Sequence, residues 1–182
     1  MAGSRAAAEV RDAGFLELTA GRTAQLYRSA CLLTGGDTHL AEDLVQDTLA
    51  RMYTIWRRQN SWLTGRSRIE DPGAYAYRVL VRTFLAHRKR RSSGELPIGE
   101  LPEGGGAPDD DSALRLTLLH ALAQLGPKDR AVLVLRHWED RSIEETAEVM
   151  QCSPGAVRTR TTRALARLRA QLGDSLAESA PR

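Results

Sequence analysis

The stretch that decides the fold is Ser142 to Leu168, which reads SIEETAEVMQCSPGAVRTRTTRALARL. Its first residue and Glu145 stand in the spacing of a capping box, which predicts a helix over residues 143–150. Residues 151–153 interrupt this helix, and the Ser-Pro pair that follows combines an N-cap with a proline at the first helical position. The stretch therefore predicts two helices joined by a short turn, the helix-turn-helix arrangement.

The second of these helices is strongly basic. It carries Arg158, Arg160, Arg163, Arg167 and Arg169, with no acidic residue between Pro154 and Gln171. An apolar stripe, which contains Val157, Ala164, Leu165 and Leu168, would turn the arginines outward. A solvated helix ordinarily mixes both signs of charge, so unopposed arginines favour a nucleic acid as partner. The candidates for contacts with bases and phosphates are Arg158, Thr159, Arg160, Thr162 and Arg163.

Residues 92–112 differ from the rest of the chain. They include three consecutive glycines, Gly104 to Gly106, and six carboxylates without a basic residue. Such a segment buries too little apolar surface to offset the entropy of ordering, so we expect a flexible acidic linker. It divides the 182 residues into an N-terminal domain over residues 10–91 and a C-terminal domain over residues 113–172.

Apolar residues recur with helical spacing through both domains. The spacing predicts helices over 26–33, 40–56 and 72–91 upstream of the linker, and over 114–125 and 128–138 ahead of the helix-turn-helix. Asp37 is the expected N-cap of the second upstream helix. Because no stretch alternates with the period of a strand for long, the expected fold class is all-α, with two small helical domains.

The N-terminal domain has a basic and an acidic-polar segment. Residues 66–91 contain eight basic and two acidic residues, with aromatic residues interleaved, a pattern typical of single-stranded nucleic-acid binding. The candidate residues in this segment and just before it are Trp62, Arg66, Arg78, Arg82, Arg88 and Arg90. In the second helix, Asp43, Gln46 and Asp47 lie opposite an apolar stripe. This acidic face disfavours DNA and would suit a basic protein partner.

Composition excludes several classes of protein. The 26 Lys and Arg nearly balance the 23 Asp and Glu, for a net charge of +3, so the charges are informative only by position. No apolar run approaches the roughly 18 to 20 residues of a membrane span, and the start lacks the pattern of a signal peptide. Cys31 and Cys152 show no metal-ligand or disulfide spacing. We therefore expect a cytoplasmic protein without cofactor, metal or membrane span.

Two alternatives involve other functions. The acidic residues Glu95, Glu100, Glu103 and Asp109 to Asp111 could suggest a two-metal nuclease. They lie in a segment without a rigid scaffold, whereas metal ligands need fixed geometry, so we expect no enzyme activity. An autonomous helix-turn-helix regulator, which binds DNA without other proteins, would explain the C-terminal domain and leave the N-terminal domain without a role.

Three stretches together resemble a known family. They are residues 32–47 with LLTGGD and AEDLVQD, residues 71–81 with DP and YRVLV, and the helix-turn-helix stretch. In this order and spacing they resemble the extracytoplasmic-function (ECF) RNA polymerase sigma factors, and most of all the actinobacterial SigE type. Three places depart from the pattern: Arg82 stands where the family usually has Asn, Ala86 and His87 replace aromatic residues common near the end of the same helix, and Gln151 fills a turn position that often holds Gly.

The resemblance implies a sigma factor that binds RNA polymerase core and directs promoter recognition, DNA opening and transcription initiation. The N-terminal domain would be sigma region 2, with Asp43, Gln46, Asp47 and Arg51 on the clamp helices of the beta-prime subunit. Residues 59–70 and the following helix would melt and read the minus-ten element. The C-terminal domain would be region 4, which meets the beta flap and reads the minus-thirty-five element. Many family members are held by an anti-sigma factor.

Overall fold

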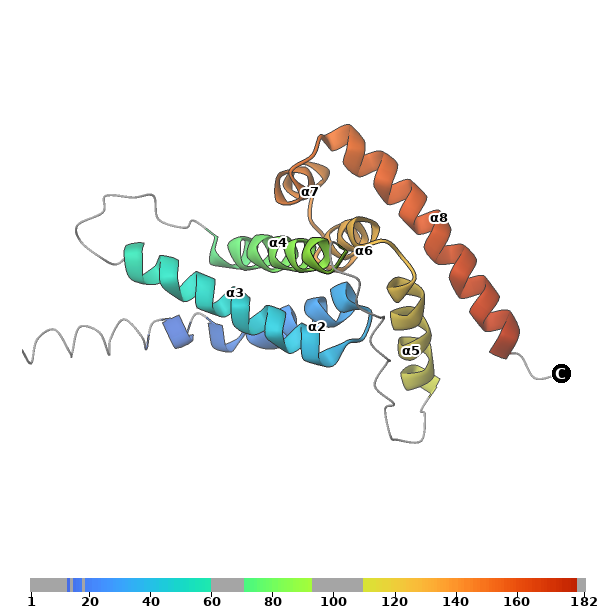
Figure 1. The fold of residues 1–182 in the computed structure, drawn as a ribbon, viewed down its shortest axis with the longest axis horizontal. Coiled ribbons are helices and arrows are strands. Elements are labelled where there is room, and N and C mark those ends of the chain that lie inside the picture. Colours follow the sequence, from blue (N-terminus) through green and yellow to red (C-terminus); the bar gives the residue numbers. More distant parts are fainter. Residues whose placement is uncertain (1–12, 14, 18, 60–70, 93–109, 180–182) are drawn as a thin grey trace, which may run out of the picture.

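The computed structural model describes residues 13, 15–17, 19–59, 71–92 and 110–179, and every regular element in these ranges is a helix. Figure 1 shows two groups of helices that lie against one another. The N-terminal helices are α2 (Thr23–Thr34), α3 (Thr38–Gln59) and α4 (Pro72–Ser92). The C-terminal helices are α5 (Asp110–Ala123), α6 (Pro127–Leu133), the π-helical turn η1 (Val134–Trp138), α7 (Ile143–Met150) and α8 (Pro154–Ser179). The all-α prediction is confirmed, and the predicted linker falls mostly outside the described residues.

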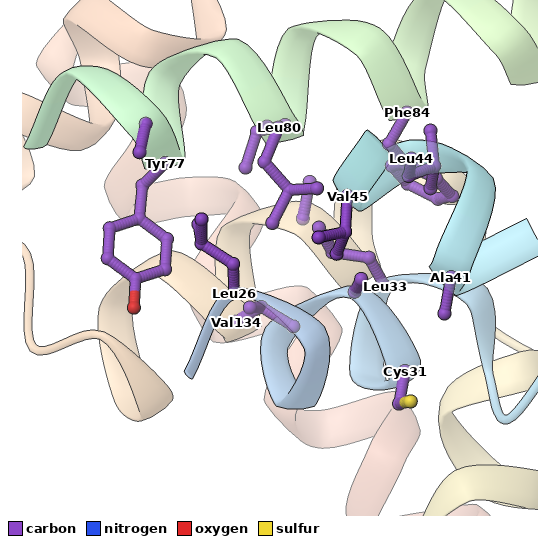
Figure 2. Close-up of a cluster of buried hydrophobic side chains, with 14 of the residues drawn as sticks. Leu26, Cys31, Leu33, Ala41, Leu44, Val45, Tyr77, Leu80, Phe84 and Val134 are labelled. Carbon is purple, nitrogen blue, oxygen red and sulfur yellow. The ribbon is translucent and has the colours of Figure 1, made fainter. Parts of the chain in front are cut away.

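The N-terminal helices enclose a core of aliphatic and aromatic side chains. Helix α3 packs against both α2 and α4. Figure 2 shows Leu26 and Leu33 of α2 pointing toward Leu80 of α4, and each of these side chains is at most 1% exposed. Leu44 of α3 and Phe84 of α4 extend the same core. The apolar spacing along each helix therefore faces inward, as the sequence predicts.

A tight turn joins α2 to α3. Gly35 ends α2 in the left-handed conformation with φ 73°, and Gly36 follows with φ 95°. These angles suit glycine because a Cβ atom would be strained there. Asp37 then accepts a 2.9 Å hydrogen bond from the backbone N–H of Leu40 through Oδ1, which confirms the predicted N-cap.

The C-terminal helices form a second core around α8, which packs against α5, α6 and α7. Val132 of α6 is fully buried there, as are Val157 and Ala164 of α8. The sequence predicts one helix over 128–138. The structure instead has α6 followed by a widened turn in which the backbone N–H of Glu139 donates to the Val134 carbonyl at 3.0 Å.

The two groups of helices share part of their cores. Residues 131–135 are all buried, so successive side chains of α6 and η1 point to every side of the helix axis. Val132 and Leu133 face the second core, whereas Ala131, Val134 and Leu135 join the first. Figure 2 shows Val134 beside Leu26. The domains thus pack together in a way that local sequence patterns do not predict. None of the described helices is long and apolar enough to cross a membrane.

Candidate functional site

The predicted helix-turn-helix is present in α7 and α8. Ser142 Oγ accepts a 3.0 Å hydrogen bond from the N–H of Glu145, whose Oε2 accepts one of 2.7 Å from the N–H of Ser142. This is the predicted capping box. Helix α7 ends at Met150, and Gln151, which caps it, adopts the left-handed conformation with φ 53°. Ser153 Oγ then accepts a 3.2 Å hydrogen bond from the N–H of Ala156 at the start of α8.

One face of α8 is basic and exposed, as the arginine pattern indicates. Val157 and Ala164 are fully buried against the second core, which fixes the orientation of the helix. Four of the five candidate residues on α8 are exposed, namely Arg158, Thr159, Thr162 and Arg163. Arg158 Nη2 lies 3.9 Å from Glu144 Oε1, an exposed pair of minor energetic weight. The basic face is thus open to a large polyanion.

The fifth candidate on α8, Arg160, is half-buried and already paired. Its Nη1 donates a 2.8 Å hydrogen bond to Oδ1 of Asp129 on α6, and Nη1 of Arg167 donates one of 2.8 Å to Oδ2 of the same carboxylate. The Asp129 side chain is only 12% exposed. The two charge-assisted hydrogen bonds therefore attach α8 to α6. The sequence gives no local sign of this, because Asp129 lies 31 residues before Arg160.

Two of the four candidate arginines on α4, Arg78 and Arg82, contact α7. Arg78 forms a 2.7 Å ion pair with Glu148 of α7. Arg82 donates hydrogen bonds to the carbonyl oxygens of Val149, at 3.2 Å, and Glu148, at 3.1 Å. Further along α4, Arg88 is half-buried and Arg90 is exposed. The other two candidates, Trp62 and Arg66, lie outside the described residues, as does most of the loop 59–70.

Within the described residues, the acidic-polar face of α3 is exposed to solvent. All four of its candidate residues are exposed, namely Asp43, Gln46, Asp47 and Arg51. On the opposite side, Leu44, Thr48 and Met52 are buried in the first core. The alternation follows the helical period, so packing of the apolar side fixes which residues α3 presents to a partner.

Arg130, which the sequence analysis did not single out, connects the two groups of helices. It is 1% exposed. Its Nη1 donates a 2.8 Å hydrogen bond to the Leu33 carbonyl of α2, and Nη2 donates to the carbonyls of Ala123 at 2.8 Å and Leu125 at 3.1 Å. Burial lowers the pKa of Arg130 to about 10, so it stays charged at neutral pH.

A buried carboxylate forms a further connection. Glu139, just after η1, accepts hydrogen bonds from the hydroxyl of Ser29 on α2 and from Tyr77 on α4. Burial raises the pKa of Glu139, and the hydrogen bonds and the nearby Arg141 and Arg28 oppose that rise. Burial also raises the pKa of Tyr77, which keeps its hydroxyl protonated as a donor.

Comparison with known proteins covers both groups of helices. The family model for sigma-70 region 2 matches residues 21–94, and that for sigma-70 region 4 matches residues 115–168. The RNA polymerase sigma-E factor of Streptomyces coelicolor is 40% identical over 162 residues, which cover 87% of this chain and 85% of that protein. The sigma-E factor of Streptomyces avermitilis is also 40% identical, over 87% of this chain and 84% of that protein.

The fold is similar to that of a solved sigma factor. In the co-crystal structure of the sigma factor RpoE with the anti-sigma factor NepR from Bartonella quintana, the matching chain has a TM-score of 0.62 and 27% sequence identity. The match covers 88% of this chain and 97% of that one. The similarity therefore extends over both groups of helices.

Proposed function

This chain belongs to the ECF group of bacterial RNA polymerase sigma factors, of the SigE type, and we propose how its surfaces divide the work of that function. A sigma factor binds RNA polymerase core and directs promoter recognition and transcription initiation. In this chain, residues 10–91 form the domain for core polymerase and the minus-ten element, and residues 113–172 form the domain for the minus-thirty-five element. Residues 92–112 link them.

The acidic-polar face of α3 binds polymerase. Asp43, Gln46, Asp47 and Arg51 are exposed on one side of a helix whose other side is anchored in the core. Such a face repels DNA and suits the clamp helices of the beta-prime subunit if these present basic residues. The beta flap is the proposed contact of the C-terminal domain. The polymerase-binding face of α3 is thus separate from the surfaces proposed for the two DNA elements.

The exposed basic face of α8 reads the minus-thirty-five element, and it is the observation that best supports the proposal. Arg158 and Arg163, with Thr159 and Thr162, lie on the outer side of a recognition helix whose inner side is buried. Arginine can make two hydrogen bonds to one guanine, and threonine can contact a thymine methyl or a phosphate. Arg160 contacts DNA only if it leaves Asp129 or uses its outer guanidinium edge.

The minus-ten element meets the basic side of α4 and the segment before it. The residues proposed for this contact are Trp62, Arg66, Arg78, Arg82, Arg88 and Arg90. Promoter opening needs no catalytic side chain, because unstacked bases can be captured on aromatic and arginine surfaces while phosphates pair with cations. The free energy for strand separation comes from the simultaneous contacts with polymerase and DNA.

The site of action and a regulator follow from this function. The protein works in the cytoplasm, where polymerase and chromosome meet. The related RpoE was solved together with an anti-sigma factor, and we propose that a protein of the same kind also controls this chain. The promoter contacts on α4 and α8 and the polymerase contacts on α3 are the surfaces that such a regulator would cover.

In vitro transcription with purified components tests the proposal. The protein, bacterial core polymerase and a promoter library are mixed, and transcripts are sequenced. We expect specific transcripts only when core polymerase and the protein are both present, and co-elution of the two at low salt. Sequence-specific DNA binding without any effect on polymerase would support the alternative, an autonomous helix-turn-helix regulator. Absence of co-elution would overturn the proposal.

A further inference from the structure

We propose that Asp129 sets how sharply α8 discriminates its own DNA sequence from other DNA: its carboxylate holds Arg160 and Arg167 back from phosphates. The inference rests on the proposed function, because it concerns the specificity of the minus-thirty-five surface. It assigns to a residue of α6, outside the recognition helix, a part in the choice of promoter.

Helix α8 has a large excess of positive charge. It carries five arginines, and residues 154–170 include no acidic side chain. Each cation that pairs with a phosphate adds affinity for any duplex, whatever its sequence. A chromosome offers about 10⁶ to 10⁹ competing sites, so the ratio of specific to general affinity matters more than either affinity alone. A recognition helix with five available arginines would therefore bind general DNA strongly.

Two of these arginines lie on the side of α8 that faces α6. Arg160 follows Val157 by three residues and Arg167 follows Ala164 by three, and both Val157 and Ala164 are fully buried. Because residues three apart are neighbours on one side of a helix, the two arginines stand beside the buried stripe. The arginines proposed to read bases are exposed on the outer side instead.

Asp129 binds both guanidinium groups at once. Its Oδ1 accepts a 2.8 Å hydrogen bond from Nη1 of Arg160, and its Oδ2 accepts one of 2.8 Å from Nη1 of Arg167. The Asp129 side chain is 12% exposed, whereas that of Glu144, which lies 3.9 Å from Arg158, is 70% exposed. Hydrogen bonds to a largely buried carboxylate are stronger than an exposed ion pair. Asp129 thus restrains its arginines, and Glu144 leaves Arg158 available.

The Asp129 carboxylate opposes phosphate binding in two ways. A phosphate that pairs with Arg160 must compete with Asp129 for the guanidinium group, and it also approaches a second negative charge. Both effects weaken phosphate pairing at this edge of α8 in any sequence. General DNA binding depends on phosphate pairing, whereas specific binding depends also on base edges. Asp129 therefore lowers general affinity more than specific affinity.

Specific binding gains from the same two hydrogen bonds. Base edges are read only when the recognition helix lies in one orientation in the major groove, and Asp129 attaches α8 to α6 at two points. A general complex tolerates a tilted helix, because phosphates line the whole duplex. Loss of the carboxylate should thus narrow the gap between specific and general affinity from both sides.

Four variants test the role of Asp129. Asp129→Asn removes the charge and keeps the shape of the side chain. Glu144→Gln is the matched control, because it removes the same charge opposite another arginine of α8, which lies 3.9 Å away, beyond hydrogen-bond distance. Arg160→Gln, alone and combined with Asp129→Asn, shows whether the effect passes through Arg160. Circular dichroism verifies that each variant is folded at the temperature of the binding experiment.

Fluorescence anisotropy measures binding of the full chain to two duplexes at several salt concentrations. One is the tightest-binding duplex that the wild-type chain selects from a random library, and the other has the same bases in scrambled order. On the scrambled duplex, Asp129→Asn should steepen the slope of log affinity against log salt by about 1 to 2, since each newly paired phosphate contributes about 0.9. The ratio of the two affinities should fall about tenfold. Glu144→Gln should leave the slope and the ratio unchanged.

The combined variant separates this role from a purely structural one. Arg160→Gln should reduce affinity for the scrambled duplex more in the Asp129→Asn background than in the wild type. A residue that only supported the fold would lower both affinities without changing the slope. That result, or equal slopes for Asp129→Asn and Glu144→Gln, would overturn the inference. Failure to select any preferred duplex would refute the proposed promoter reading by α8, whereas the slopes on the scrambled duplex would still decide the role of Asp129.

Discussion

Asp129 of α6 holds Arg160 of α8 by a 2.8 Å hydrogen bond and shares its second oxygen with Arg167. One carboxylate thereby attaches the recognition helix to the rest of the C-terminal domain at two points. Arg160 is 37% and Arg167 64% exposed at the side chain, so solvent screening reduces the strength of both pairs. The orientation of α8 depends more on Asp129 than on either arginine alone.

Asp129→Asn should therefore destabilise the protein. The amide keeps the shape but loses the negative charge for two guanidinium groups, and we expect a loss of about 1 to 2 kcal/mol in the free energy of unfolding. Urea unfolding followed by circular dichroism measures it. Asp140→Asn is the matched control, because Asp140 is exposed and its left-handed backbone tolerates Asn. Equal unfolding midpoints for both variants would contradict the role of Asp129.

Gly35→Ala should be strongly destabilising. The alanine would need a φ of 73°, and its Cβ would lie 2.7 Å from the Cβ and 2.9 Å from the Cα of Ala123. We expect a loss of about 2 to 3 kcal/mol from backbone strain and overpacking together. Gly173→Ala should do the reverse, with a gain of about 0.5 to 1 kcal/mol, because Gly173 lies within α8 and has open space around it. Thermal unfolding of both variants distinguishes the two effects. A melting temperature below that of the wild type for both variants would contradict the prediction.

Asp47→Arg and Arg163→Ala should impair different activities. Reversal of the charge on the acidic face of α3 should weaken binding to core polymerase at least about tenfold, with little effect on contact of the full chain with minus-thirty-five DNA. Loss of the Arg163 guanidinium should cost about 1 to 3 kcal/mol of DNA binding and leave polymerase affinity unchanged. Fluorescence anisotropy with labelled core and labelled DNA measures both. Parallel losses in either variant would show that the surfaces are not separate.

Glu139 should make stability depend on pH. Burial raises the pKa of Glu139 above its ordinary value of 4.5, so the folded chain favours the protonated form more than the unfolded chain does. The cost of burying the charge is absent below pH 4.5, increases as the pH rises from there toward the higher folded-state pKa, and is constant above that pKa. Ser29 and Tyr77, which donate to Glu139, and the cations Arg28 and Arg141 reduce this cost without removing it.

Comparison with Glu139→Gln isolates this effect. We expect the free energy of unfolding of the wild type, relative to that of the variant, to fall as the pH is raised above 4.5, because only the wild type acquires a buried charge. Urea unfolding at each pH gives the difference. If this difference were constant or rose over the interval, the carboxylate would not be penalised by burial.

Local patterns predicted much of the fold. Helix α7 has the predicted bounds, 143–150, because its capping box and its left-handed end lie within a few residues of each other. The orientation of α3 and α8 also followed from apolar spacing, which records the side that a helix buries. These signals are short-range and can be read from a single chain.

The packing between domains could not be predicted in the same way. Arg130 contacts Leu33, which lies 97 residues earlier, and Arg82 contacts Val149 across 67 residues. In the sequence, Arg82 is one of many arginines, and nothing near it distinguishes a residue that binds a helix end from one that awaits a phosphate. Because the sequence around an arginine does not show what it binds, the assignment of arginines to the minus-ten and minus-thirty-five elements stays a prediction.

The acceptors of Arg130 are main-chain oxygen atoms of Leu33, Ala123 and Leu125, and every amino acid supplies such an oxygen. A salt bridge between side chains can be lost by substitution at either end, whereas this link is vulnerable at Arg130 alone, provided the backbone keeps its path. Sequence drift in α2 or α5 therefore leaves the acceptors in place. The contact between the two halves of the molecule can persist while the residues around it diversify.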